Sequence, residues 1–167
     1  MLEVLILSLI QGITEFLPVS SSSHLIIISE YLKLNEQNLT LDVSLHIGSF
    51  IAVMTYFYKD IINFLKNKEL FFKILISSIP VMIFGIILVE TNLINALRNI
   101  KTIGWMTLVF GIILFISDKF KLNKDLKKDF SFKTAITIGF FQVLSLIPGV
   151  SRSGITITAA RLLNFKR

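Results

Sequence analysis

The sequence predicts an all-α, polytopic membrane protein, and two features of its composition carry this prediction. Hydrophobic residues make up 53% of the 167-residue chain, and charged residues make up only 17%. Soluble proteins have roughly 25% charged residues, so disorder, a nucleic-acid-binding tail and most soluble enzymes are excluded. The long Ile and Leu runs fit hydrocarbon surroundings, where a helix needs about 20 apolar residues to cross about 30 Å.

Charged breaks divide the chain into seven apolar runs. They are Leu2–Leu17, Val19–Leu32, Val43–Tyr58, Ile74–Val89, Ile103–Ser117, Thr134–Ile147 and Ile155–Phe165. The third, fourth and fifth runs can cross a bilayer once their interfacial flanks are included. The other four form two broken pairs, one divided at Pro18 and Ser20–Ser23, the other at Pro148-Gly149. Their short length predicts re-entrant half-helices rather than full spans.

Lysines gather in two short segments, which predicts the cytoplasmic loops. Lys59–Lys73 carries four lysines and Asp118–Lys133 carries six, whereas Glu30–Asp42 and Glu90–Lys101, which carry fewer basic residues, are expected outside. The first broken pair then enters from the outer face and the second from the cytoplasmic face, so their breaks meet near the midplane. Anionic lipid headgroups, and not nucleic acid, are the expected counterpart of the net charge of +6.

The two breaks also resemble each other in sequence, which is an internal-repeat signal. Nine residues beyond Gln11 lies Ser20, and nine beyond Gln142 lies Ser151. Opposite entry faces and a shared pattern predict an inverted-topology repeat with its site between the halves; chance similarity of Ser/Pro-rich breaks is the alternative. The chain is expected to be one membrane domain, truncated at its C-terminus. Its expected parts are a first repeat at 1–117, a cytoplasmic loop at 118–133 and part of a second repeat at 134–167.

Gln11 and Glu15 precede the first break and share one helix face, because they are four residues apart. A charge at membrane depth costs about 2.5–3.5 kcal/mol, so a carboxylate there indicates a specific functional or structural role. It can accept a proton or, together with Gln11, bind Mg²⁺ or Ca²⁺ through oxygen. A structural hydrogen-bonded pair is the alternative.

The half-helix after the first break begins with Ser20–Ser23 and His24. Serine is a good N-cap, so any single serine has an explanation without catalysis. His24 lies three residues after Ser21 on the same helical face, and can be a nucleophile or a base for a Ser hydroxyl. For His46, which follows Asp42 by four residues, we expect a structural or interfacial role.

The second break carries Arg152 between Ser151 and Ser153, with Thr156 one turn further on. A guanidinium group binds phosphate oxygens in bidentate fashion. Both half-helices also direct their N-termini at the same region, which favours an anion there. Phosphate or pyrophosphate is the expected occupant, and a structural salt bridge between Arg152 and Glu15 is the alternative.

Two long motifs and one shorter motif carry a family resemblance. Residues 11–24 resemble the signature (E/Q)G-x-TEFLPVSS-x-x-H of the bacterial undecaprenyl-diphosphatase family, and residues 148–156 resemble its PG-x-SRSG-x-T signature. Residues 42–49 are similar to a third, softer block. The resemblance implies an inner-membrane phosphatase that converts undecaprenyl diphosphate to the monophosphate, which recycles the lipid carrier for peptidoglycan synthesis. It further implies a reaction on the outer side, a required divalent cation and bacitracin resistance.

The resemblance also assigns roles to individual residues. The catalytic set carried over is Glu15, Ser21, His24 and Arg152, while Gln11 stands at the family's first acidic position, so one carboxylate is absent there. Residues expected to contact the polyprenyl diphosphate are Gln11, Ser20, Ser22, Ser151, Ser153 and Thr156. The nucleophile stays open between His24, a serine and water. A carrier or flippase for polyprenyl phosphates is the alternative function, and a homodimer is left open.

Overall fold

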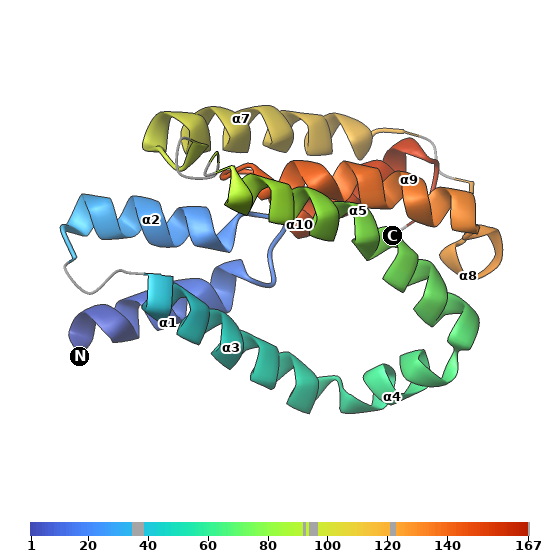
Figure 1. Cartoon of the computed structure of the whole chain (residues 1–167), viewed down its shortest axis with the longest axis horizontal. Coiled ribbons are helices and arrows are strands. Elements are labelled where there is room, and N and C mark those ends of the chain that lie inside the picture. Colours follow the sequence, from blue (N-terminus) through green and yellow to red (C-terminus); the bar gives the residue numbers. More distant parts are fainter. Residues whose placement is uncertain (35–38, 92, 94–96, 121–122, 167) are drawn as a thin grey trace.

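The computed structural model describes residues 1–34, 39–91, 93, 97–120 and 123–166, and their regular structure is helical (Figure 1). One isolated bridge, between Lys124 and Phe165, is the exception among these residues. The all-α prediction is therefore confirmed for the described part of the chain.

The helices follow the predicted apolar runs closely. The first broken pair forms α1 (Leu2–Thr14) and α2 (Ser21–Leu32), and the second forms α9 (Phe132–Val143), the 3₁₀ turn η1 (Leu144–Leu146) and α10 (Arg152–Leu162). Between them lie α3 (Leu39–Tyr56), α4 (Tyr58–Lys66), α5 (Lys68–Glu90), α7 (Ile100–Ser117) and the short α8 (Leu126–Asp129).

Several of these helices begin where a polar side chain caps the first turn. In α5, α7, α9 and α10 the preceding residue accepts a hydrogen bond from the backbone N–H three residues later, which satisfies one of the free donors at a helix start. The four capping residues are Asn67, Asn99, Ser131 and Ser151. The cap at Asn67 explains why α5 begins six residues before the apolar run predicted from Ile74.

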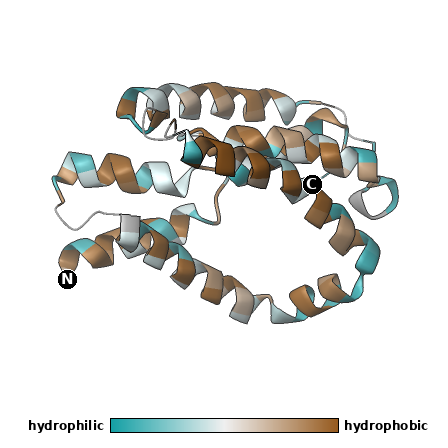
Figure 2. Ribbon diagram, in the orientation of Figure 1, coloured by the Kyte–Doolittle hydropathy of each residue, from teal (hydrophilic) through white to brown (hydrophobic). Residues whose placement is uncertain are grey.

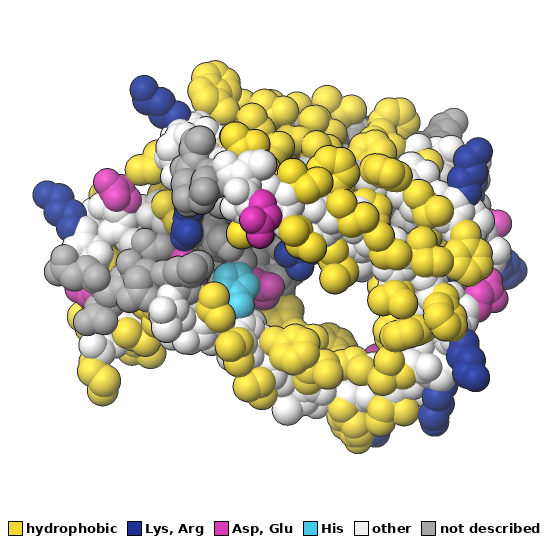
Figure 3. Space-filling view, viewed as in Figure 1, with side chains coloured by type: hydrophobic (Ala, Val, Ile, Leu, Met, Phe, Trp, Pro, Cys, Tyr) yellow, Lys and Arg dark blue, Asp and Glu magenta, His cyan; other side chains and the backbone are white. Residues whose placement is uncertain are grey.

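Among the described residues, two helices, α5 and α7, are long and apolar enough to cross a membrane, and the number is three if the bent pair α3–α4 counts as one span. Hydrophobic residues run along α5 and α7 (Figure 2), and apolar side chains cover the face that these helices present (Figure 3). Only 17% and 11% of their apolar windows are buried within the molecule. So much exposed apolar surface fits a multi-pass membrane protein.

The predicted third span, Val43–Tyr58, is not one straight helix. The chain leaves helical geometry at Phe57, and α3 and α4 meet at an angle of 78°. The helix α4 carries Lys59, Asp60 and Lys66, whose charges favour water over hydrocarbon. The sequence pattern located the apolar run but not this bend.

Each broken pair forms a helical hairpin, and the two hairpins point toward each other from opposite ends of the molecule (Figure 1). Their tips touch, because Ser153 Oγ donates a hydrogen bond to the Leu17 carbonyl oxygen at 3.4 Å. A Cβ atom added to Gly154 would lie 3.2 Å from the Pro18 carbonyl oxygen. The two breaks, 130 residues apart at their prolines (Pro18 and Pro148), therefore form one region of the structure.

Two glycines permit close approach of the second hairpin to its neighbours. At Gly139 a Cβ atom would lie 2.2 Å from the Ser77 carbonyl oxygen, so α9 packs directly against the backbone of α5. Gly149 has a φ of +102°, and a Cβ there would lie 2.6 Å from the Ile103 carbonyl oxygen of α7. The Thr107 hydroxyl donates to the Gly149 carbonyl oxygen at 3.2 Å, which fixes the break against α7.

Substitution of Gly139 by Ala should destabilise the protein by about 1–3 kcal/mol, because the added methyl group must push two helix backbones apart. Gly104→Ala is the matched control, since a Cβ on that helical glycine meets nothing within 4 Å. Thermal unfolding in detergent would measure both variants. A Gly139→Ala midpoint equal to that of Gly104→Ala would contradict the packing of α5 against α9.

Candidate active site

Both helix breaks contribute to one polar cavity of about 260 Å³. Seven of the ten site residues predicted from the sequence line it: Glu15, Ser20, Ser21, Ser22, Ser151, Arg152 and Ser153. The remaining lining residues are Val19, His46, Ser145 and Val150. Residues from the two ends of the chain thus face one another across a space large enough for a phosphate group.

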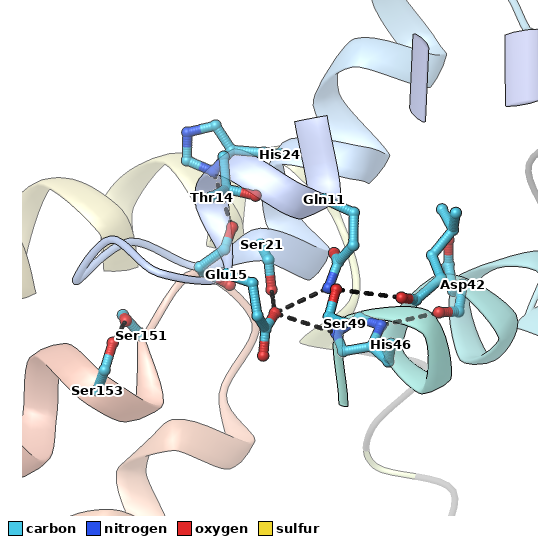
Figure 4. Close-up of polar contacts among 12 residues, drawn as sticks. Gln11, Thr14, Glu15, Ser21, His24, Asp42, His46, Ser49, Ser151 and Ser153 are labelled. Atoms are coloured by element: carbon cyan, nitrogen blue, oxygen red, sulfur yellow. Dashed lines mark hydrogen bonds and ion pairs between the residues drawn. The ribbon is translucent and has the colours of Figure 1, made fainter. Parts of the chain in front are cut away.

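Glu15, which directly follows α1, organises the polar contacts of this cavity (Figure 4). Its Oε2 atom accepts hydrogen bonds from Gln11 Nε2 at 2.8 Å and from Ser21 Oγ at 2.7 Å. Gln11 is only 1% exposed, so it supports the carboxylate from behind and does not line the cavity. A Ser hydroxyl that donates to a carboxylate is positioned to lose its proton to it.

The sequence suggested that His24 belongs to the catalytic site and that His46 is structural, but in the structure His46 is the histidine beside Glu15. The imidazole of His24 points away from Glu15 in Figure 4, its Nδ1 lies 2.8 Å from the Ser20 carbonyl oxygen, and it does not line the 260 Å³ cavity. His46 on α3 does line the cavity, with its Nε2 atom 3.8 Å from Glu15 Oε2. Its Nδ1 atom lies 2.8 Å from the Asp42 carbonyl oxygen, which fixes the ring orientation.

The second break presents Arg152 in the first turn of α10. Its side chain is exposed and has no ion-pair partner among the residues that the structure describes, so the alternative of a Glu15–Arg152 salt bridge is not observed. Ser151 Oγ accepts from the Gly154 N–H at 3.2 Å and lies 3.1 Å from Ser153 Oγ. Thr156, by contrast, donates to backbone carbonyls of its own helix and does not line the cavity.

Asp42 and Arg98 form an ion pair that sequence reasoning did not anticipate. Arg98 Nη2 lies 3.1 Å from Asp42 Oδ2, and the Asp42 residue is 6% exposed. The pair lines a second cavity of about 720 Å³, to which His46, Ser20 and Ser22 also contribute. No spacing rule connects positions 56 residues apart, so a local pattern could not have revealed this contact.

The donors around Glu15 are compatible with a hard divalent cation. The Glu15 carboxylate lines the cavity, and Gln11 faces it with its Nε2 donor, while Gln11 Oε1 is buried without a hydrogen-bond partner. The described residues include no cluster of three or more His, Cys, Asp or Glu side chains that could hold a metal. Mg²⁺ is commonly bound by one or two protein oxygens, with substrate phosphates and water completing its shell, and the Glu15 carboxylate fits that mode.

Comparison with known proteins identifies the family that these motifs represent. The family model described as "Bacitracin resistance protein BacA" matches residues 4–167, which include both breaks and every cavity residue. The chain belongs to the BacA family. The family resemblance predicted from the motifs is therefore confirmed.

Curated members of the BacA family share much of this sequence. The chain is 49% identical over 167 residues to the undecaprenyl-diphosphatase of Pelagibacter ubique, covering 99% of this chain and 65% of that protein. It is 44% identical to the undecaprenyl-diphosphatase of Halothermothrix orenii, covering 99% and 65%, and 41% identical to that of Jannaschia, covering 97% and 66%. The chain thus spans slightly less than two thirds of the length of these relatives.

Proposed function

We propose that this BacA-family protein hydrolyses undecaprenyl diphosphate to undecaprenyl phosphate and inorganic phosphate, and so recycles the lipid carrier for peptidoglycan synthesis. Bacitracin resistance would follow, because less diphosphate remains for the antibiotic to bind. The observation that carries the proposal is the Ser21–Glu15 hydrogen bond of 2.7 Å in a cavity that Arg152 also lines. The names of the curated relatives agree with it.

Positive potential from two sources supports binding of a diphosphate in the 260 Å³ cavity. Arg152 supplies a permanent charge with a planar fork that matches two phosphate oxygens. The N-termini of α2 and α10 begin at cavity residues, and each carries the equivalent of about half a positive charge. Together these groups stabilise the negative charge that develops on phosphate oxygens during transfer.

The contacts favour Ser21 as the nucleophile. In the first step Ser21 Oγ bonds to the terminal phosphorus, its proton passes to Glu15, and the bond from phosphorus to the bridging oxygen breaks, with its electron pair leaving on undecaprenyl phosphate. Glu15 gives that proton to the departing phosphate. In the second step the oxygen of a water molecule bonds to the phosphorus held on Ser21 Oγ, and Glu15 takes a proton from that water. The bond from phosphorus to Ser21 Oγ breaks with its electron pair on Oγ, Glu15 returns the proton to Oγ, and inorganic phosphate leaves.

A divalent cation, Mg²⁺ or Ca²⁺, is proposed to bind beside the diphosphate through Glu15, whose carboxylate Gln11 orients from behind. When bound, it would neutralise charge on the phosphate oxygens. Support comes from the Glu15 carboxylate, which lines the cavity together with Arg152 and the serines of both breaks. Glu15 would then hold the cation with one oxygen and the Ser21 hydroxyl with the other.

The proposed setting is the bacterial inner membrane, with two re-entrant hairpins forming an inverted repeat and the cavity open to the outer side. Support comes from the opposed hairpins, whose tips touch at Ser153 and Leu17, and from the lysine-rich segments predicted to be cytoplasmic. A carrier needs the anion site but not a serine paired with a carboxylate, so this pair favours hydrolysis over transport.

Phosphate release from undecaprenyl diphosphate by the purified protein tests the function directly. Release should depend on Mg²⁺ or Ca²⁺ and stop when EDTA is added. Ser21→Ala should lower kcat by at least about 100-fold, the lower end for loss of a positioned proton-transfer partner. His24→Gln should lower it far less, since His24 does not line the cavity. Substrate binding without phosphate release would favour the carrier, and an active Ser21→Ala variant would favour direct attack by water.

Substitution of Arg152 by Lys should reduce kcat/KM by about 10- to 100-fold, because a point charge cannot keep both oxygen contacts and one charged hydrogen bond is worth about 1.5–3 kcal/mol. The folded protein should be retained, since the side chain is exposed. Steady-state kinetics and a thermal unfolding curve of the same preparation would separate the two effects. Wild-type turnover by Arg152→Lys would show that Arg152 does not bind the phosphate.

Accessibility of introduced cysteines tests the proposed orientation, and the chain has no cysteine of its own. Thr91 and Lys66 flank opposite ends of α5 and are both exposed. In intact cells, a membrane-impermeant thiol reagent should label Thr91→Cys and not Lys66→Cys. Both should be labelled after the cells are opened. The reverse pattern would place the reaction on the cytoplasmic side.

A further inference from the structure

A second cavity, of about 720 Å³, adjoins the candidate active site. The two cavities share part of their walls, formed by Ser20, Ser22, His46, Ser145 and Val150. The larger cavity therefore lies directly beside the space lined by Arg152 and Ser21.

Away from the wall that the two cavities share, the lining of the larger cavity is mostly apolar. Val43, Ile47 and Phe50 lie at positions i, i+4 and i+7 of α3, so they form one stripe along that helix. Ile26 of α2, Val89 of α5 and Ile147 of the second break complete an apolar lining. The smaller cavity is polar and the larger one apolar.

The apolar stripe on α3 is not covered by packing within the described structure. The exposed fractions are 50% for Val43, 53% for Ile47 and 61% for Phe50. The charged residues in the lining, Asp42 and Arg98, lie 3.1 Å apart and neutralise each other. The wall therefore presents hydrocarbon and a compensated ion pair, which suits an uncharged, flexible, apolar ligand.

We infer that the larger cavity binds the isoprenoid units next to the diphosphate of the substrate. This inference rests on the proposed function, because it assigns the second part of the same molecule. A prenyl diphosphate has a charged head joined covalently to a branched hydrocarbon chain, and the two adjoining cavities have that order of polarity. Drug-sized ligands occupy cavities of about 300–1,000 Å³, so a cavity of 720 Å³ accepts the first few isoprenoid units and leaves the remaining chain in the bilayer.

Ile47→Trp tests this assignment against a closely matched control. Ile51 lies one turn further along α3 and is 55% exposed, against 53% for Ile47, yet it does not line the cavity. Ile47→Trp should raise KM for farnesyl and undecaprenyl diphosphate by about 10- to 200-fold, the range for a misfit in a hydrophobic pocket. Ile51→Trp should leave KM unchanged.

An inhibitor that lacks the isoprenoid chain shows whether Ile47→Trp weakens only the binding of that chain. Methylenebisphosphonate occupies only the phosphate site, so its inhibition constant should be the same in wild type and Ile47→Trp. An equal loss for this competitor and for the prenyl substrates would mean that the substitution disturbs the phosphate cavity. That outcome would overturn the inference, as would an unchanged KM for the prenyl substrates.

A binding measurement keeps the tail site separate from the proposed hydrolysis. The probe is a farnesyl bisphosphonate, which resists hydrolysis, with a photoreactive diazirine on its first isoprenoid unit. Crosslinks in the wild-type protein should map to Val43–Phe50, and excess methylenebisphosphonate should suppress them. Crosslinks elsewhere, or crosslinks displaced only by phospholipid, would make the cavity an ordinary lipid contact and overturn the inference. Crosslinks at Val43–Phe50 without any phosphate release would refute the hydrolysis and leave the tail site standing.

Discussion

The structure depends on the way two interrupted helices satisfy the backbone groups that their breaks set free. A helix end leaves donors or acceptors without partners, and such groups are costly away from water. Here Ser151 caps α10, the Thr107 hydroxyl reaches the Gly149 carbonyl, and Ser153 donates to the Leu17 carbonyl. Because the last of these contacts joins the two hairpins, the requirement that shapes each break also brings the breaks together.

This junction gathers unlike charges without pairing them. On the first hairpin, Glu15 accepts hydrogen bonds from Gln11 and Ser21. Arg152 lies on the second hairpin and has no ion-pair partner among the described residues. A salt bridge between them would neutralise both groups. Kept apart, the carboxylate remains available for proton transfer and the guanidinium for an anion, and the two helix N-termini add to the positive potential beside Arg152.

The helix α3 links this polar junction to its apolar neighbour. One turn of the helix places His46 on both cavities, and the residues that follow on that face line only the larger one. The ion pair from Asp42 to Arg98 fixes the N-terminal end of α3, because the nearly buried carboxylate needs its cationic partner. A single helix can thus align the head and the chain of an amphiphile, which neither hairpin could do alone.

The sequence by itself determined the features that depend on local spacing. Charged breaks located the apolar runs, the four-residue separation placed Gln11 and Glu15 on one helix face, where they form a hydrogen bond, and the Ser/Pro-rich breaks predicted the interruptions of the helices. Only the tertiary structure decided which histidine meets Glu15: the neighbour in sequence, His24, points away, and His46 arrives from another helix. The bend at Phe57 and the pairing of Asp42 with Arg98 likewise could not be predicted from the sequence. Contacts within a helix follow from its 3.6-residue period, whereas contacts between helices depend on how whole surfaces pack, which no single segment encodes.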